Sequence, residues 1–167
     1  MKLDNRFSDF IRYIESLAER HTEVEHLKDG VSHFIRLDTD ELDNSIKQTV
    51  GFPVICLDRY SANLAGQEGN ISKKRGITLM ILDYVPDIKD YNRIHEVWDN
   101  CEAIADDFVS QIYQDITKGL APGMFDMDLS SVEYELAGNR SLSLYGAIVT
   151  FPVTSKFCTK PRSDSFK

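Results

Sequence analysis

The stretch that decides the fold is residues 52–85, "FPVICLDRYSANLAGQEGNISKKRGITLMILDYV". Its two ends, 52–60 and 76–85, are apolar and predict two strands of a hairpin. Residues 61–76 between them are small and polar and are interrupted by Gly66 and Gly69, which predicts a loop. Hairpin loops usually have about two to five residues. This predicted loop is roughly three times as long, which is more than is needed to join the two strands.

The composition is that of a soluble globular protein. The 167 residues suffice for one α+β domain, which we place at 1–157, followed by a polar, mildly basic tail at 158–167. There is no apolar run of membrane-spanning length, and the first ten residues lack a signal-peptide core, so we expect a protein that is made in the cytoplasm and avoids membranes. The net charge of −8 argues against a protein that wraps nucleic acid.

The cysteines and histidines predict neither a metal site nor a cofactor. Cys56 and Cys101 fall on apolar positions and are interpreted as small core residues, whereas Cys158 lies in the tail. The sequence has no C-x-x-C motif, and its four histidines show no recognised ligand spacing.

Three helices are predicted from periodicity and caps. Apolar residues recur on one helical face from Phe7 to Leu17, and again from Ile94 to Ile116 in a long helix that begins near Asp90 and ends before Gly119. A short extra helix is predicted at 38–50, where a capping box precedes one apolar stripe.

The remaining strands complete an α+β prediction. Residues 31–37 form a short strand, "SSVEYEL" is expected to point Val132, Tyr134 and Leu136 inward, and 143–153 returns as its partner. The element order predicts a mostly antiparallel sheet of about four to five strands packed against one long helix. Because the strand 77–85 is apolar on both faces, either the N-terminal helix or a neighbouring subunit must cover the second face.

A search for catalytic chemistry finds little. The sequence has no nucleophile elbow, Walker loop or dinucleotide fingerprint. Asp58 and Asp83 lie on adjacent predicted strands and could form a carboxylate pair. This pair supports an alternative interpretation as a small α+β enzyme or ligand-binding module, although both carboxylates could equally lie in water near strand ends.

The long helix carries acids opposite its apolar stripe. Their spacing places them on one helical face, and like charges at these spacings cost a few tenths of a kcal/mol per pair; they are Glu96, Asp99, Glu102 and Asp106. This acidic stripe is either a solvated face that maintains solubility or a surface that repels polyanions.

The order of elements resembles a known family. An N-terminal amphipathic helix precedes an "FPV" strand, a long polar loop, a second strand, one long helix, and a hairpin of "VEYEL" with "LYGAIVTFPVTSKF". Over residues 5–157 this pattern resembles the tail terminator and tail-completion, or head–tail joining, proteins of long-tailed bacteriophages and their relatives in contractile injection particles. The predicted helix at 38–50 departs from the family pattern.

The resemblance implies a structural virion protein and no enzyme. Such proteins form a ring, commonly a hexamer, at the head-proximal end of the tail tube, stop tube growth and join the tail to the head or neck. The implied partners are further copies of the chain, the tail tube protein and a neck or head-completion protein, while DNA passes without specific binding. On this interpretation the acidic stripe faces the DNA channel.

The long loop then becomes a docking arm. It offers polar groups for hydrogen bonds and two apolar anchors, namely Asn63, Leu64, Gln67, Glu68, Asn70 and Ile71. The alternative is a surface insertion that is merely tolerated.

Overall fold

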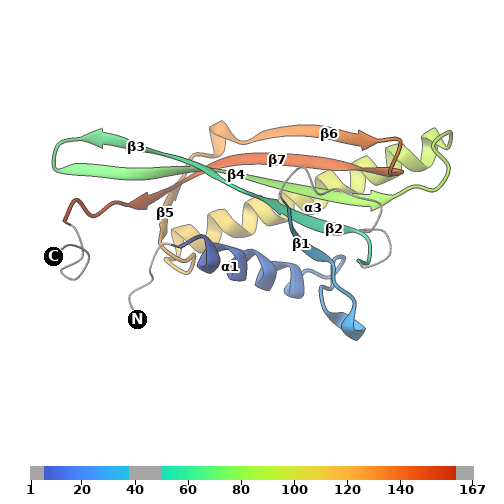
Figure 1. The fold of residues 1–167 in the computed structure, drawn as a ribbon, viewed down its shortest axis with the longest axis horizontal. Coiled ribbons are helices and arrows are strands. Elements are labelled where there is room, and N and C mark those ends of the chain that lie inside the picture. Colours follow the sequence, from blue (N-terminus) through green and yellow to red (C-terminus); the bar gives the residue numbers. More distant parts are fainter. Residues whose placement is uncertain (1–5, 38–49, 161–167) are drawn as a thin grey trace.

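The computed structural model describes residues 6–37 and 50–160, without the side chains of Leu37 and Phe125. These residues form an α+β fold in which two helices lie on one face of a mixed, seven-stranded sheet (Figure 1). The predicted helix at 38–50 falls almost wholly outside the described residues, as does most of the predicted tail. The α+β class, the long helix and the mostly antiparallel pairing agree with the sequence analysis, since β1 with β2 is the one parallel pair among the described strands, whereas the strand count does not agree.

Two long antiparallel strands run through the middle of the sheet. β4 (Asn70–Tyr84) pairs with β7 (Leu144–Lys156) from Ser72 opposite Lys156 to Tyr84 opposite Leu144. All the remaining strands join the sheet through these two or through their direct partners.

The shorter strands share positions along the central pair. β2 (Val54–Asp58) and β3 (Ser61–Gln67) follow one another along β4, while β5 (Met124–Met127) and β6 (Glu133–Asn139) follow one another along β7. β1 (Phe34–Leu37) pairs with β2 in parallel, which makes the sheet mixed. Seven strands therefore occupy five positions across the sheet. The prediction of four to five strands was too low because β3 falls in the predicted loop and β5 was not predicted.

The predicted loop at 61–76 is wrong, because these residues form a β-hairpin. Ser61 pairs with Gly76 and the ladder continues to Gln67 opposite Asn70. Only Glu68 and Gly69 remain for the turn, in which Gly69 has φ +89°, a conformation that glycine adopts without steric cost. We call residues 61–76, which comprise β3 and the first half of β4, the ribbon.

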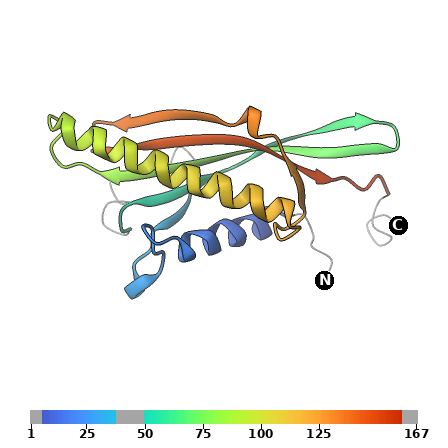
Figure 2. The same ribbon diagram turned by 180° about the vertical axis from the view of Figure 1, so that it is seen from behind.

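The helices pack side by side on one face of the sheet (Figure 2). α1 (Phe7–Arg20) buries the apolar stripe predicted for it, and α3 (Tyr91–Thr117) buries its own between Ile94 and Ile116. Asp90 caps α3 by accepting a hydrogen bond from the backbone N–H of Arg93. Short 3-10 turns occur at Lys28–Gly30 and Leu129–Ser131. The main core lies between this helical layer and the sheet.

A second apolar cluster occupies the opposite face of the sheet. Its buried members come from three strands and from the turn before β7: Val54, Cys56, Met80, Leu82, Leu142 and Leu144. Because α1 packs beside α3 in the other core, the prediction that the N-terminal helix could cover this second face is wrong. Cys56 and Cys101 are buried as predicted, and burial raises the pKa of the Cys101 thiol to about 12.

A buried polar contact ties the two helices together. Tyr13 on α1 donates a hydrogen bond of 2.8 Å to the carboxylate of Asp115 on α3, and Gln111 donates a second one of 2.8 Å. Asp115 is only 6% exposed, so these donors replace the water that its carboxylate loses. Burial, reinforced by Asp115, raises the pKa of the Tyr13 hydroxyl.

We predict that Tyr13→Phe lowers the free energy of unfolding by about 1–3 kcal/mol, because a buried carboxylate loses a donor. Urea unfolding followed by circular dichroism measures this. The difference in the free energy of unfolding between wild type and Tyr13→Phe should shrink above about pH 10. Above that pH the Tyr13 hydroxyl ionises more readily in the unfolded chain than in the folded one, which destabilises the wild type. Tyr113→Phe, at a 40% exposed position on α3, is the matched control and should stay within about 0.5 kcal/mol. Equal effects of the two changes would contradict the role of this contact.

Candidate functional site

The ribbon extends the sheet beyond the helical layer (Figures 1 and 2). Strand alternation gives it two unlike faces. On the face that continues the helix-covered side lie Leu64, which is 52% exposed, and half-buried Ile71. Phe157, which is 40% exposed, directly follows the end of β7, where Lys156 pairs with Ser72 of the ribbon. The ribbon therefore carries an exposed apolar patch, which we define as Leu64, Ile71 and Phe157.

The opposite face of the ribbon is polar. Asn63, Gln67 and Asn70 occupy it and are exposed, and Glu68 is exposed in the turn. The six residues predicted for a docking arm therefore lie in the ribbon but do not act as one surface. Leu64 and Ile71 are diagonal neighbours on one face, while the three amides belong to the other.

The base of the ribbon is fixed to the body. Arg75 is 7% exposed, donates to the hydroxyl of Ser155 on β7, and places its guanidinium 5.3 Å from the centre of the Tyr60 ring. Tyr60 in turn meets Phe7 of α1 edge to face, with ring centres 5.0 Å apart. These contacts oppose a hinge at the start of the ribbon, so the expectation of a loose loop is replaced by an anchored arm.

The acidic stripe lies on the exposed side of α3, and all four of its carboxylates reach the surface. Glu96 is 3.2 Å from Arg93. Asp106 accepts a hydrogen bond of 2.7 Å from the hydroxyl of Tyr134 on β6. Burial and the Asp106 carboxylate raise the pKa of Tyr134. The C-terminal half of the stripe therefore runs beside the edge strand β6.

Of the three side chains predicted to point inward, Val132 is half-buried against the main core, whereas the predicted burial of Tyr134 and Leu136 is wrong. Tyr134 is 40% exposed and Leu136 is 50% exposed. Both point to the helix-covered side, opposite Val149 and Ala147, but β6 lies at the edge of the sheet. α3 contacts this edge where the indole N–H of Trp98 donates a hydrogen bond of 2.8 Å to the backbone carbonyl of Ala137. Tyr134 and Leu136 therefore remain exposed on the side of the sheet that carries α3. Asp106 and Glu102 of that helix lie near Tyr134.

Asp58 and Asp83 do not form a carboxylate pair. The register sets Asp58 on the same face as Val54 and Cys56, whereas Asp83 shares the helix-covered face with Ile81. Asp83 lies 3.8 Å from Arg93 on α3. Because the two carboxylates occupy opposite faces of the sheet, they cannot act on one substrate atom.

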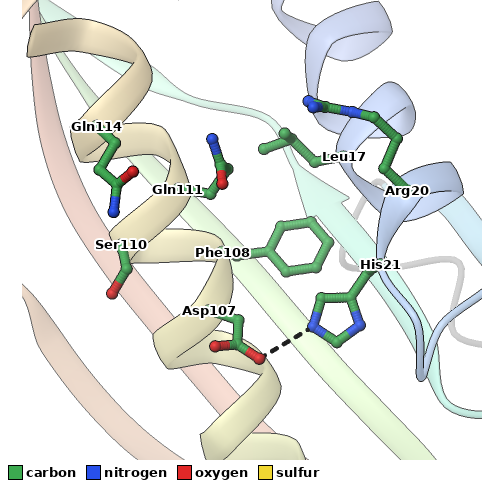
Figure 3. A pocket seen from close by; sticks show the side chains of 8 residues that line it. All are labelled: Leu17, Arg20, His21, Asp107, Phe108, Ser110, Gln111 and Gln114. Atoms are coloured by element: carbon green, nitrogen blue, oxygen red, sulfur yellow. Dashed lines mark hydrogen bonds and ion pairs between the residues drawn. The ribbon is translucent and has the colours of Figure 1, made fainter. Parts of the chain in front are cut away.

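A groove of about 380 Å³ opens between α1 and α3, a feature missed in the sequence analysis (Figure 3). Ser110, His21 and Asp107 line it, which suggests a hydrolytic triad. His21 Nε2 lies 3.2 Å from Asp107, and its Nδ1 accepts from the backbone N–H of Glu23. Since both ring nitrogens are occupied and Ser110 points away from His21, the imidazole cannot activate this hydroxyl.

The described part of the chain offers no metal site and no helix suited to a bilayer. Within residues 6–37 and 50–160, no group of three His, Cys, Asp or Glu side chains is arranged so that it could hold a metal ion. In the same residues no helix combines the length and the apolarity required to cross a membrane. A scan against protein-family models gives no match to this sequence, and a search of curated proteins gives none either.

The anchoring of the ribbon can be tested through Arg75. We predict that Arg75→Lys increases the rate of amide hydrogen exchange in the ribbon about tenfold or more. The ammonium group of lysine cannot both donate to Ser155 and lie over the Tyr60 ring as the planar guanidinium does. Exchange in α3 should stay unchanged. Lys74→Arg, on an exposed neighbouring position, is the control. Unchanged exchange in the Arg75→Lys ribbon would show that pairing with β7 alone holds it.

Proposed function

We propose that this protein is a structural component of a phage-like tail that terminates or completes the tail tube. The observation that carries the proposal is an anchored, amphipathic ribbon that projects from a small α+β body and exposes apolar side chains. An exposed apolar patch on a strand surface is typical of a protein–protein contact, and an assembly protein requires a surface that becomes buried on docking.

The proposed assembly is a closed ring at the head-proximal end of the tube, most simply a hexamer. One surface of the ring binds the last layer of tail tube protein and prevents the addition of another, and the opposite surface receives a neck or head-completion protein. DNA passes through the ring without specific contacts. Virion localisation and a structural role without catalysis are parts of the same proposal.

Two uses are compatible with the acidic stripe. It can line the channel, where its charge discourages phosphate contacts, or it can receive a basic surface of another subunit. Lys73 and Lys74 of the ribbon carry positive charge of the kind that such a subunit surface needs.

The proposed function is tested by removing the coding gene from the phage or prophage that carries it. Electron microscopy should reveal tubes of uncontrolled length and heads without tails, because nothing halts tube growth. Supplying the gene on a plasmid should restore tails of uniform length. Normal tails in the absence of the gene would contradict the proposal.

A shortened ribbon gives a sharper prediction. Replacing residues 64–73 by Asn-Gly preserves the pairs from Ser61 to Asn63 with Lys74 to Gly76 and retains a two-residue hairpin turn. We expect a folded protein with an unchanged far-ultraviolet spectrum that fails to restore uniform tails. As a control, Asn63→Ser combined with Gln67→Ser alters only the polar face and should restore them. Full rescue by the shortened variant would show that the ribbon is dispensable.

A further inference from the structure

The exposed apolar patch on the ribbon has a counterpart on the same molecule. We define the acidic shelf as Glu102 and Asp106 of α3 together with Tyr134 and Leu136 of β6. Tyr134 and Leu136 supply exposed apolar surface, and the two carboxylates border it. In Figure 2, α3 lies between α1 and β6, so within residues 6–37 and 50–160 no second helix covers β6.

Charge distinguishes the ribbon from the shelf. Residues 61–76 and 152–160 contain five cations, Lys73, Lys74, Arg75, Lys156 and Lys160, and one acid, Glu68. α3 contains six acids and one cation, Arg93, in a chain whose net charge is −8. The ribbon and the end of β7 beside it are thus net positive, with Arg75 buried against Ser155 and with Lys74 and Lys156 on the polar face, whereas α3 is net negative.

Lys73 lies within the apolar face of the ribbon. It stands opposite Leu64 on β3, and its position on β4 shares a face with Ile71. A lysine beside two aliphatic side chains matches a shelf on which Asp106 accepts a hydrogen bond from Tyr134 and Glu102 adds a second negative charge near that tyrosine. Both surfaces combine an apolar centre with charge of opposite sign.

We propose that the ribbon of one copy docks on the acidic shelf of the next copy, with Leu64, Ile71 and Phe157 covering Tyr134 and Leu136 while Lys73 meets Glu102. This inference rests on the proposed ring, because it supplies the contact between neighbouring subunits. The two surfaces differ, so the contact is heterologous and repeats from head to tail until the ring closes.

The proposed contact assigns a different use to each half of the acidic stripe. Glu102 and Asp106 become part of the subunit interface. Glu96 and Asp99, nearer the N-terminal end of α3, remain outside the defined shelf. Burying the apolar patch against Tyr134 and Leu136 supplies the affinity, and the charges select the register and direction of docking.

The test uses disulfide trapping in a Cys158→Ser background, because Cys56 and Cys101 are buried and Cys158 is exposed. Leu64→Cys and Leu136→Cys are made as separate proteins and mixed at the highest concentration that remains soluble. Mild oxidation should link them into a mixed dimer, seen by mass spectrometry, while neither protein should link efficiently to itself. Asn63→Cys, on the polar face of the ribbon, is the matched control and should not link to Leu136→Cys.

Charge reversal provides an independent measurement. Lys73→Glu or Glu102→Lys should each weaken self-association about tenfold in sedimentation analysis, and the two changes in one chain should recover most of the loss. The proposal is overturned if the mixture gives no mixed dimer, if Asn63→Cys links equally well, or if the double reversal is weaker than both single ones. A ribbon that contacts the tail tube alone would give the first of these results.

The outcomes separate the two proposals. Trapped dimers together with normal tails from a phage lacking the gene would retain the subunit contact and refute the terminator role. Tails of uncontrolled length in the phage lacking the gene, without trapped dimers, would support the terminator role and refute the subunit contact.

Discussion

The antiparallel pairing of β4 with β7 is the constraint on which the rest of the structure depends. It runs without a break from Ser72 to Tyr84, and each shorter strand joins one of these two strands or a direct neighbour. The two backbones approach so closely that a Cβ atom on Gly146 would lie 1.9 Å from the carbonyl oxygen of Ile81. A side chain at residue 146 would therefore force the central ladder apart, so this position requires glycine.

The length of this ladder explains how one small domain provides both a core and an arm. The helices cover the part of the sheet whose side chains are Ile77, Leu79 and Ile81, and beyond it the same strands continue as the ribbon. Arg75 marks the boundary, since its guanidinium is buried against Ser155 and Tyr60. The arm is thus a continuation of the core strands, and its position is set by the packing of the body.

The sequence predicts the parts of this fold that depend on local pattern. Both described helices follow from apolar periodicity, and α3 begins at Tyr91, close to the predicted start near Asp90. The ribbon was misinterpreted because its apolar face contains only Leu64 and Ile71, with Gly66 between them in the alternation. The one available signal was the Glu68-Gly69 turn. Neither the edge position of β6 nor the opposite faces of Asp58 and Asp83 could be predicted, because both depend on strand order and register, which no local pattern encodes.

Exposed strands with apolar side chains invite unwanted pairing, and the charge pattern of this protein opposes it. Two ribbons that met face to face would bring their Lys73 ammonium groups together within an apolar contact. The cost of desolvating like charges disfavours that pairing. The same lysine is attracted to a shelf bordered by Glu102 and Asp106. One charged residue within an apolar face therefore acts against symmetric association and in favour of docking on a different surface, and docking of that kind is the geometry that a closed ring requires.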